Sequence, residues 1–291
     1  KALRPQTVKG YRWALTGEPS VSWTRRPLAT ITDRDIIKAV EAYEIKKQFA
    51  SARLFRAYVH RFFRWAVEKR LIDKNPASNI PLASSPSDFD RERVLTVAEL
   101  GLVLNAANKL DNPARAFLKL LIFCGQRRGE TSLMKWSYLQ LEGNMPAWFI
   151  PAENAKNHLR HDVPLPHEIV PILLGLPKIG EFVFTTDGKT PPTGFSKIKA
   201  QIDRLLTESN IPHWTFHDLR RSCATGMANP SIGPHTIEAI LNHVSGAKSG
   251  VAGLYNRSKY DVERRQALTK WVGHLLNMSS GNEQLLNVEA K

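Results

Sequence analysis

Residues 118–136 read LKLLIFCGQRRGETSLMKW, an apolar run followed by a glycine and two arginines. The run predicts a buried helix from about Pro113 to Cys124, because glycine, here Gly125, commonly follows the last residue of a helix. A further helix is predicted from about Arg128 to Tyr138. The stretch therefore predicts two helices joined by a tight turn that carries an arginine.

Arg127 falls in this turn, directly before the second helix. Backbone N–H groups at a helix N-terminus also favour anions, so the arginine and the helix together could hold a phosphate. Glu130 could orient the arginine or cap the helix. A surface pair of arginines beside a glutamate has the same sequence, so this motif alone leaves both interpretations open.

The next part of the chain changes from helical to strand-like patterns. Residues 148–150, 162–165 and 181–185 predict three short strands, which we expect to form a small antiparallel sheet between helices. Lys156 falls in the turn between the first two strands.

Helical patterns then resume at four places. They are residues 194–208, 216–227, 234–241 and 262–276. The last helix is amphipathic and packs either on its own domain or on a neighbouring protomer. Residues 279–291 are expected to form a tail that is mobile or docks elsewhere.

Two of these helices carry histidines next to other chemically active side chains. His217 and Arg220 lie three residues apart, which places them on one helix face, with Thr215 as the candidate N-cap. His243 ends the next helix, and Tyr255 follows twelve residues later. A His-x-x-Arg pattern is common by chance and most tyrosines only pack, so neither motif is specific alone.

Residues 30–75 are predicted to be helical, with the clearest pattern over residues 51–73 and a helix end near Asn75 and Pro76. The residues on its apolar side are Leu54, Phe55, Tyr58, Phe62, Trp65 and Ala66. The residues on its basic side are Arg53, Arg56, His60 and Arg64. A solvated polar face would look similar, but residues 51–67 contain no acidic side chain, so we expect Arg53, Arg56 and Arg64 to contact DNA.

Residues 79–88, NIPLASSPSD, have the composition of a linker. We place the domain boundary there, with a helical DNA-binding bundle at 1–88 and a second domain at 89–291. Thr96 and Glu99 form a capping-box pattern that opens the second domain's first helix. The predicted fold class is mainly α with a small antiparallel β-sheet.

The charge of the chain favours a polyanionic partner. The formal net charge is +14, and residues 1–88 carry 17 Lys and Arg against 8 Asp and Glu. Phosphate backbones attract such surfaces through counterion release, although a solubilising excess of charge would look the same.

Other classes of protein fit the sequence poorly. The apolar runs are too short to span a membrane, and residues 1–10 lack the apolar segment of a secretory signal. Cys124 and Cys223 are too few for a disulfide scaffold or a metal cluster, which fits a reducing cytoplasm, and both are expected to be small buried residues. The chain starts at Lys1, which suggests a piece of a longer protein.

The informative feature is the joint occurrence of six polar residues in a fixed order. They are Arg127, Lys156, His217, Arg220, His243 and Tyr255. Arginine offers a planar fork to two phosphate oxygens, histidine exchanges protons near neutral pH, and a tyrosine hydroxyl can attack phosphorus. Together they could transfer a phosphoryl group without a metal or another cofactor.

These residues and their contexts resemble the catalytic domain of the tyrosine recombinases, the phage-integrase family, over about residues 92–275. The motifs of that resemblance are GQRRGE at 125–130, Lys156 before VPL at 163–165, HDLR at 217–220, LNH at 241–243 and GLYN at 253–256. Residues 241–257 look most like integrases of prophages and genomic islands. Met134 replaces the usual leucine and Asn242 the usual glycine, and residues 1–88 are similar to the family's core-binding domain.

The resemblance implies a mechanism for cutting and rejoining DNA. Tyr255 would attack the scissile phosphate to give a 3′-phosphotyrosyl link, and Arg127 and Arg220 would clamp the non-bridging oxygens. Lys156 would protonate the leaving 5′-oxygen, and His217 would accept the tyrosine proton. His243 would hydrogen-bond the phosphate.

The resemblance also implies binding partners and leaves two alternative functions open. It implies attachment-site duplexes, four protomers at the synapse, DNA-bending accessory proteins as candidate partners, and a place near the nucleoid. A further N-terminal arm-binding domain, common in the family, has no counterpart here. A type IB topoisomerase would share the six residues but relax DNA only, and an inactive DNA-binding relative would bind without cutting.

Overall fold

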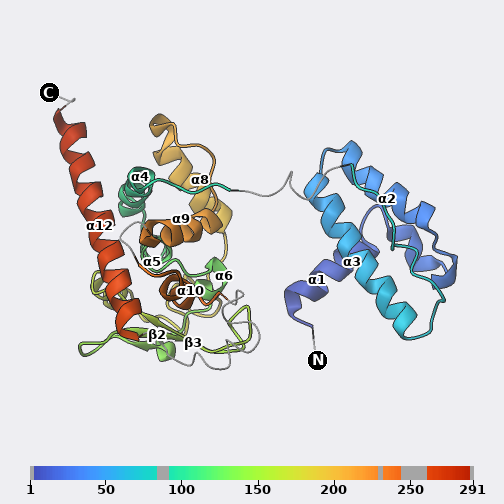
Figure 1. Cartoon of the computed structure of the whole chain (residues 1–291), viewed down its shortest axis with the longest axis horizontal. Coiled ribbons are helices and arrows are strands. Elements are labelled where there is room, and N and C mark those ends of the chain that lie inside the picture. Colours follow the sequence, from blue (N-terminus) through green and yellow to red (C-terminus); the bar gives the residue numbers. More distant parts are fainter. Residues whose placement is uncertain (1–2, 84–91, 229–231, 244–260, 289–291) are drawn as a thin grey trace. The chain divides into compact units, whose positions relative to one another are not determined.

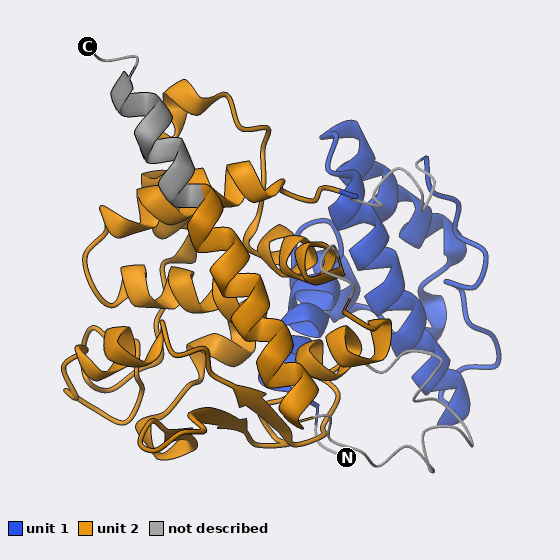
Figure 2. Ribbon diagram, turned by 60° about the vertical axis from the view of Figure 1, so that its left-hand side comes forward, with its two compact units in different colours: residues 1–92 blue, residues 93–291 orange. Residues whose placement is uncertain are grey.

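The computed structural model describes residues 3–83, 92–228, 232–243 and 261–288, with side chains of the last helix described as far as residue 278. The chain divides into two compact units, residues 1–92 and 93–291 (Figure 2). The predicted boundary after residue 88 lies outside the described residues and stays a prediction.

Unit 1 is a small helical bundle (Figure 1). Its helices are α1 (Pro5–Thr16), α2 (Asp33–Ile45) and α3 (Phe49–Glu68), with short 3₁₀ turns at Val21–Arg25 and Leu28–Thr30. Thr32 and Asp35 form a capping box at the start of α2. Aromatic rings from all three helices meet around Phe55, which is fully buried.

Helix α3 differs from its prediction in length and in its buried face. It ends at Glu68 rather than near Asn75 and Pro76, because Arg70 adopts a left-handed backbone conformation with φ of 57°. Its buried side chains are Ala52, Phe55, Val59, Phe63 and Ala66. Leu54 and Trp65, predicted on the apolar side, are 51% and 46% exposed. A helix does form in this part of the chain, but its buried face differs in part from the face that the sequence predicts to be buried.

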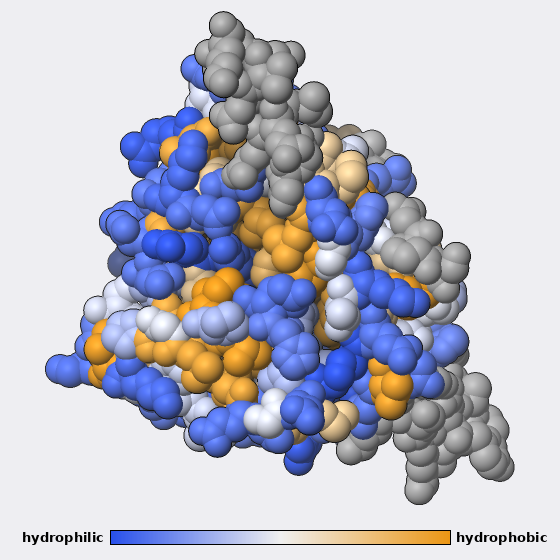
Figure 3. All heavy atoms as spheres, turned by 90° about the vertical axis from the view of Figure 1, so that its left-hand side faces the viewer, coloured by the Kyte–Doolittle hydropathy of each residue, from blue (hydrophilic) through white to orange (hydrophobic). Residues whose placement is uncertain are grey.

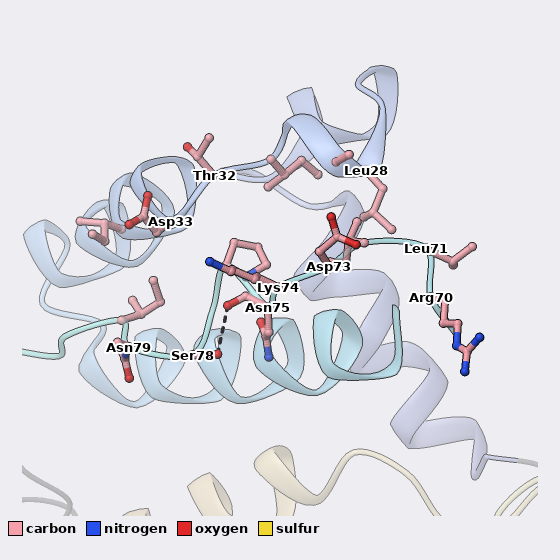
Figure 4. Close-up of a pocket in the computed structure, with 16 residues that line it drawn as sticks. Leu28, Thr32, Asp33, Arg70, Leu71, Asp73, Lys74, Asn75, Ser78 and Asn79 are labelled. Carbon is pink, nitrogen blue, oxygen red and sulfur yellow. Dashed lines mark hydrogen bonds between the residues drawn. The ribbon is translucent and has the colours of Figure 1, made fainter. Parts of the chain in front are cut away.

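An open hollow of about 680 Å³ lies in unit 1 between residues 28–37 and 70–80 (Figure 4). Asp33 and Asp73 line it together with Arg70 and Lys74, so its charges are mixed. None of the six predicted catalytic residues belongs to it.

Unit 2 is built around α5 (Ala114–Cys124), in which all but three residues are buried. Around it pack α4 (Val97–Asn108), α9 (Phe216–Ala228) and α12 (Asp261–Val288), while α10 (Pro234–Leu241) packs on α9 and α12. α8 (Phe195–Leu205) contacts α4, and a short α7 spans Val170–Leu174. The capping box of Thr96 and Glu99 opens α4, as the sequence predicts.

A three-stranded antiparallel sheet lies beside these helices, in the order β1 (Leu139–Gln140), β2 (Ala147–Ile150) and β3 (His161–Pro164) (Figure 1). Trp148 pairs with Val163, and both are buried. The mainly α fold with a small antiparallel sheet is therefore confirmed.

Two predicted elements around the sheet are wrong. Residues 181–185 form a single bridge, Lys135 to Phe182, so the third strand is β1 instead. The helix after Arg127 stops early: α6 spans Arg128–Ser132, and a 3₁₀ turn follows at Trp136–Tyr138. Backbone bonds from Val183 to Met134 and from Trp136 to Glu181 pull this stretch out of the helix.

One face of helix α12 packs within its own unit. Its buried residues Ala267, Leu268, Trp271, Val272 and Leu275 belong to the core of unit 2. Its backbone stays helical to Val288, so the helix is longer than the predicted range of residues 262–276. On this side of unit 2, apolar patches interrupt a largely polar surface (Figure 3).

Candidate active site

The turn after α5 carries the first arginine. Gly125 takes the left-handed conformation with φ of 60°, and a side chain there would meet Cys223 Sγ at 2.8 Å. Glycine is therefore required by both backbone and packing. Arg127 follows as the N-cap residue of α6, in extended conformation.

Glu130 ties this arginine to the loop between β2 and β3. Its Oε1 accepts hydrogen bonds from Arg127 and from the backbone N–H of Lys156, each at 2.9 Å. Glu130 is only 4% exposed, so its charge is well shielded from water. One carboxylate thus links the arginine to the predicted lysine.

Arg220 is a buried cation on α9, only 3% exposed. Its guanidinium donates to the carbonyl of Gly125 at 2.9 Å and to the carbonyl of Leu241. Burial, and then the charge of Arg127, lower its pKa to about 10. The group stays protonated at neutral pH and is held rigidly by two turns far apart in sequence.

His217 lies one turn before Arg220 and is exposed. Desolvation lowers its pKa, with further lowering by Arg221 and Arg220. The neutral form that results can accept a proton. At the start of this helix the Thr215 hydroxyl donates to the Asp218 carboxylate at 3.0 Å, and the helix begins at Phe216 as predicted.

His243 follows α10, in which the carbonyls of Ile240 and Leu241 accept side-chain hydrogen bonds from other elements. Asn242, the C-cap residue, is left-handed with φ of 50°. Desolvation, then Arg220 and Arg127, lower the pKa of His243, so the histidine lies within the field of both arginines.

Four of the six predicted residues line one cleft of about 590 Å³: Arg127, Lys156, His217 and Arg220. His243 adjoins the cleft through the electrostatic contacts above. Tyr255 lies outside the described residues. A fixed, buried arginine beside a second arginine, a lysine and a neutral histidine is suited to hold a phosphodiester.

Sequence reasoning missed the aromatic and basic wall of this cleft. The Arg128 guanidinium lies 5.0 Å from the centre of the Phe195 ring, and the Lys199 ammonium lies 4.2 Å from that of Trp214. No local motif marks these pairs, because α8 and the residues before α9 meet α6 only in the folded unit.

A buried histidine behind the site was missed as well. His161, 6% exposed, lies with Nε2 2.8 Å from the carbonyl oxygen of Ile240, to which Gln126 also donates at 2.9 Å. Burial lowers the pKa of His161 to about 4, so it is neutral at pH 7 and donates its N–H. The end of α10 is therefore held by β3 and the Arg127 turn together.

The three predicted DNA-binding residues lie along α3. Arg64 is exposed and lies 3.6 Å from Glu68, while Arg53 and Arg56 are half-buried. Their contact with DNA stays a prediction.

The remaining sequence expectations concern cysteines, metals and membranes. Cys124 and Cys223 are free and buried as predicted, and burial raises the pKa of Cys223 to about 12. Within the described ranges, no group of three or more His, Cys, Asp or Glu side chains could hold a metal ion. None of the helices described here combines the length and apolarity that crossing a bilayer requires.

Residues 93–261 match the phage integrase family, and residues 2–83 match the phage integrase central domain. Because the first match alone covers more than half of the chain, the chain belongs to the phage integrase family of tyrosine recombinases. Its similarity to prophage integrases agrees with the resemblance found in the motifs.

Two relatives illustrate that similarity. Prophage integrase IntZ of Escherichia coli (strain K12) is 24% identical, over 91% of this chain and 65% of its own length. The integrase of Escherichia phage HK022 is 27% identical, over 84% of this chain and 69% of its own. The chain thus spans just under two thirds of the length of IntZ, and 62% of that of IntA from the same organism.

Solved structures share the fold. A lambda integrase(75-356) dimer bound to a COC' core site matches with a TM-score of 0.63 and 22% identity, over 84% of this chain and 90% of that one. A XerH site-specific recombinase bound to palindromic difH matches with a TM-score of 0.62 and 17% identity, over 87% and 77%.

Proposed function

We propose that this chain is a site-specific DNA recombinase that integrates or excises a mobile element by cutting and rejoining DNA. The observation that carries the proposal is the single cleft lined by Arg127, Lys156, His217 and Arg220. Family membership and the net charge of +14 support DNA as the substrate.

In the proposed reaction the Tyr255 hydroxyl attacks phosphorus, and the bond from phosphorus to the 5′-oxygen breaks. His217 takes the tyrosine proton, which its lowered pKa permits at neutral pH. Lys156 gives a proton to the departing 5′-oxygen. The product is a 3′-phosphotyrosyl link and a free 5′-hydroxyl.

The arginines stabilise the negative charge that develops on phosphorus. Arg220 is fixed by two backbone carbonyls and Arg127 by Glu130, so neither has to reorganise during the reaction. In this proposal no metal is required, because the arginines and the lysine supply the positive charge. No ATP is required either, because the phosphotyrosyl bond keeps the energy of the phosphodiester for resealing.

The proposed assembly is a tetramer on two attachment-site duplexes, in which unit 1 and its α3 arginines clamp DNA. One of the similar solved structures is a lambda integrase tetramer bound to a Holliday junction, which supports this stoichiometry. DNA-bending accessory proteins are part of the same proposal.

Covalent trapping tests the nucleophile. Nicked duplexes from the ends of the element that encodes this chain are incubated without metal, with parent, Tyr255→Phe and Tyr138→Phe proteins. We expect a covalent adduct on denaturing gels with the parent and with Tyr138→Phe, and none with Tyr255→Phe. An adduct of undiminished yield with Tyr255→Phe would make the assignment wrong.

Product analysis separates the two rival functions. Recombination of two duplexes excludes a topoisomerase that only relaxes supercoils. DNA binding without any adduct from the parent would favour an inactive DNA-binding relative.

A further inference from the structure

Asn242 adopts a conformation that glycine accepts at lower cost. It ends α10 with φ of 50° and ψ of 44°, in the left-handed region that side chains usually avoid. The residue is also only 8% exposed, which points to a specific partner rather than to solvation.

That partner is Asn157, 85 residues earlier in the chain. The Asn157 amide donates to the side-chain oxygen of Asn242 at 2.9 Å and to its backbone carbonyl at 3.3 Å. The Asn242 amide donates back to Asn157 Oδ1 at 3.2 Å. Asn157 Oδ1 also accepts the backbone N–H of Leu159 at 3.1 Å, which shapes the loop.

The pair joins two catalytic segments by their immediate neighbours. Asn157 follows Lys156, whose own backbone N–H is bound to Glu130 at 2.9 Å, and Asn242 precedes His243. The loop that carries Lys156 is therefore attached at two consecutive residues, once to Glu130 of α6 and once to the end of α10.

We infer that Asn157 and Asn242 are a positioning pair that sets the reach of Lys156 in the cleft. Lysine has a flexible four-carbon stem, and the Lys156 side chain is exposed, so its backbone anchor limits where the ammonium can lie. Proton transfer in the transition state requires that placement within hydrogen-bond reach. This inference rests on the proposed function and adds two residues to its machinery.

The test compares single-turnover cleavage by Asn157→Ala, Asn242→Gly and the double variant. Asn242→Gly keeps the left-handed backbone free of strain and removes only the amide. We expect each single change to slow adduct formation on the order of tenfold, and the double change to slow it little further, since each single change already breaks the side-chain bonds between the two amides. Asn210→Gly is the matched control, because Asn210 is also left-handed, with φ of 48°, and we expect it to cleave at the parent rate.

A second substrate separates positioning from folding. A duplex with sulfur in place of the bridging 5′-oxygen releases a thiolate, which needs no proton because a thiol is far more acidic than an alcohol. We expect Asn157→Ala, like Lys156→Ala, to cleave this duplex at a rate within about threefold of the parent. On the ordinary duplex the same variant is expected to be slower on the order of tenfold.

Each outcome decides one of the two ideas. Parent-like cleavage of the ordinary duplex by Asn157→Ala, or equal slowing on both duplexes, would overturn the positioning pair and leave the proposed function intact. No adduct from the parent on either duplex would overturn the proposed function and the pair together.

Discussion

At the residue scale, we expect the buried cation Arg220 to contribute both to stability and to the proposed cleavage. Its two carbonyl partners belong to turns 95 and 21 residues away in sequence, and both lie in buried surroundings. We expect Arg220→Lys to lose about 1–3 kcal/mol of unfolding free energy, because one ammonium cannot reproduce the planar fork that serves both carbonyls.

The same substitution should slow cleavage by roughly 100-fold or more, the scale of losing one charge-stabilising donor. Urea unfolding and single-turnover trapping measure the two effects. Exposed Arg204 supplies the control, since Arg204→Lys should leave both quantities unchanged. Full activity of Arg220→Lys would argue against a clamp on the phosphate.

His161 predicts a pH dependence of stability. Its pKa is about 4 in the folded chain against 6.5 in the unfolded chain, so the unfolded state binds more protons between these values. Its stabilising contribution is complete above pH 6.5 and is lost as the pH falls toward 4. From pH 7 to pH 5 the loss is roughly 2 kcal/mol by proton linkage.

His161→Gln checks this, because glutamine can still donate to the Ile240 carbonyl but does not titrate in this range. Urea unfolding at pH 7 and pH 5 should show a smaller loss for the variant than for the parent. Equal losses would mean that another group dominates in this window.

At the scale of elements, Glu130 connects α6 to the loop between β2 and β3. We expect Glu130→Ala to cost roughly 2 kcal/mol of unfolding free energy, less than a fully buried pair because the Arg127 side chain is 21% exposed. Glu68→Ala, which removes an exposed partner of Arg64, should cost within about 0.5 kcal/mol. Chemical denaturation of both variants gives the comparison, and equal costs would contradict the role of Glu130.

The elements also show how far local sequence signals reach. The capping box at Thr96, the stop at Gly125 and the start at Phe216 depend on neighbours in the chain, and each agrees with the structure. The strand predicted at residues 181–185 failed because strand pairing is a long-range choice, and β2 pairs with β1 instead. The rotation of α3 failed for the same reason, since the helix packs on α1 and α2.

At the scale of the whole molecule, the excess positive charge predicts a strong salt dependence of DNA binding. If the α3 arginines contact phosphates, replacing Arg53, Arg56 and Arg64 together by glutamine should lower the slope of log affinity against log salt by about 3. Binding titrations from 50 to 200 mM salt measure the slope.

A double change of exposed residues on α2, Arg34→Gln with Lys38→Gln, gives the comparison for charge alone. We expect a smaller change of slope for each cation removed from α2 than from α3. Equal changes of slope for each cation removed would show that the α3 arginines do not contact DNA more closely than the α2 residues.

The sequence by itself determined the fold class, the order of the helices around the cleft and the residue types proposed for catalysis, because these follow from patterns within a few residues or from motif order. Only the tertiary structure decided which groups meet behind those residues. The bonds of Gln126 and His161 to Ile240, of Arg220 to Gly125 and of Asn157 to Asn242 span 79 to 114 positions of the chain. Such bonds form only when buried polar groups must find partners inside a shared core, a requirement that no local pattern records.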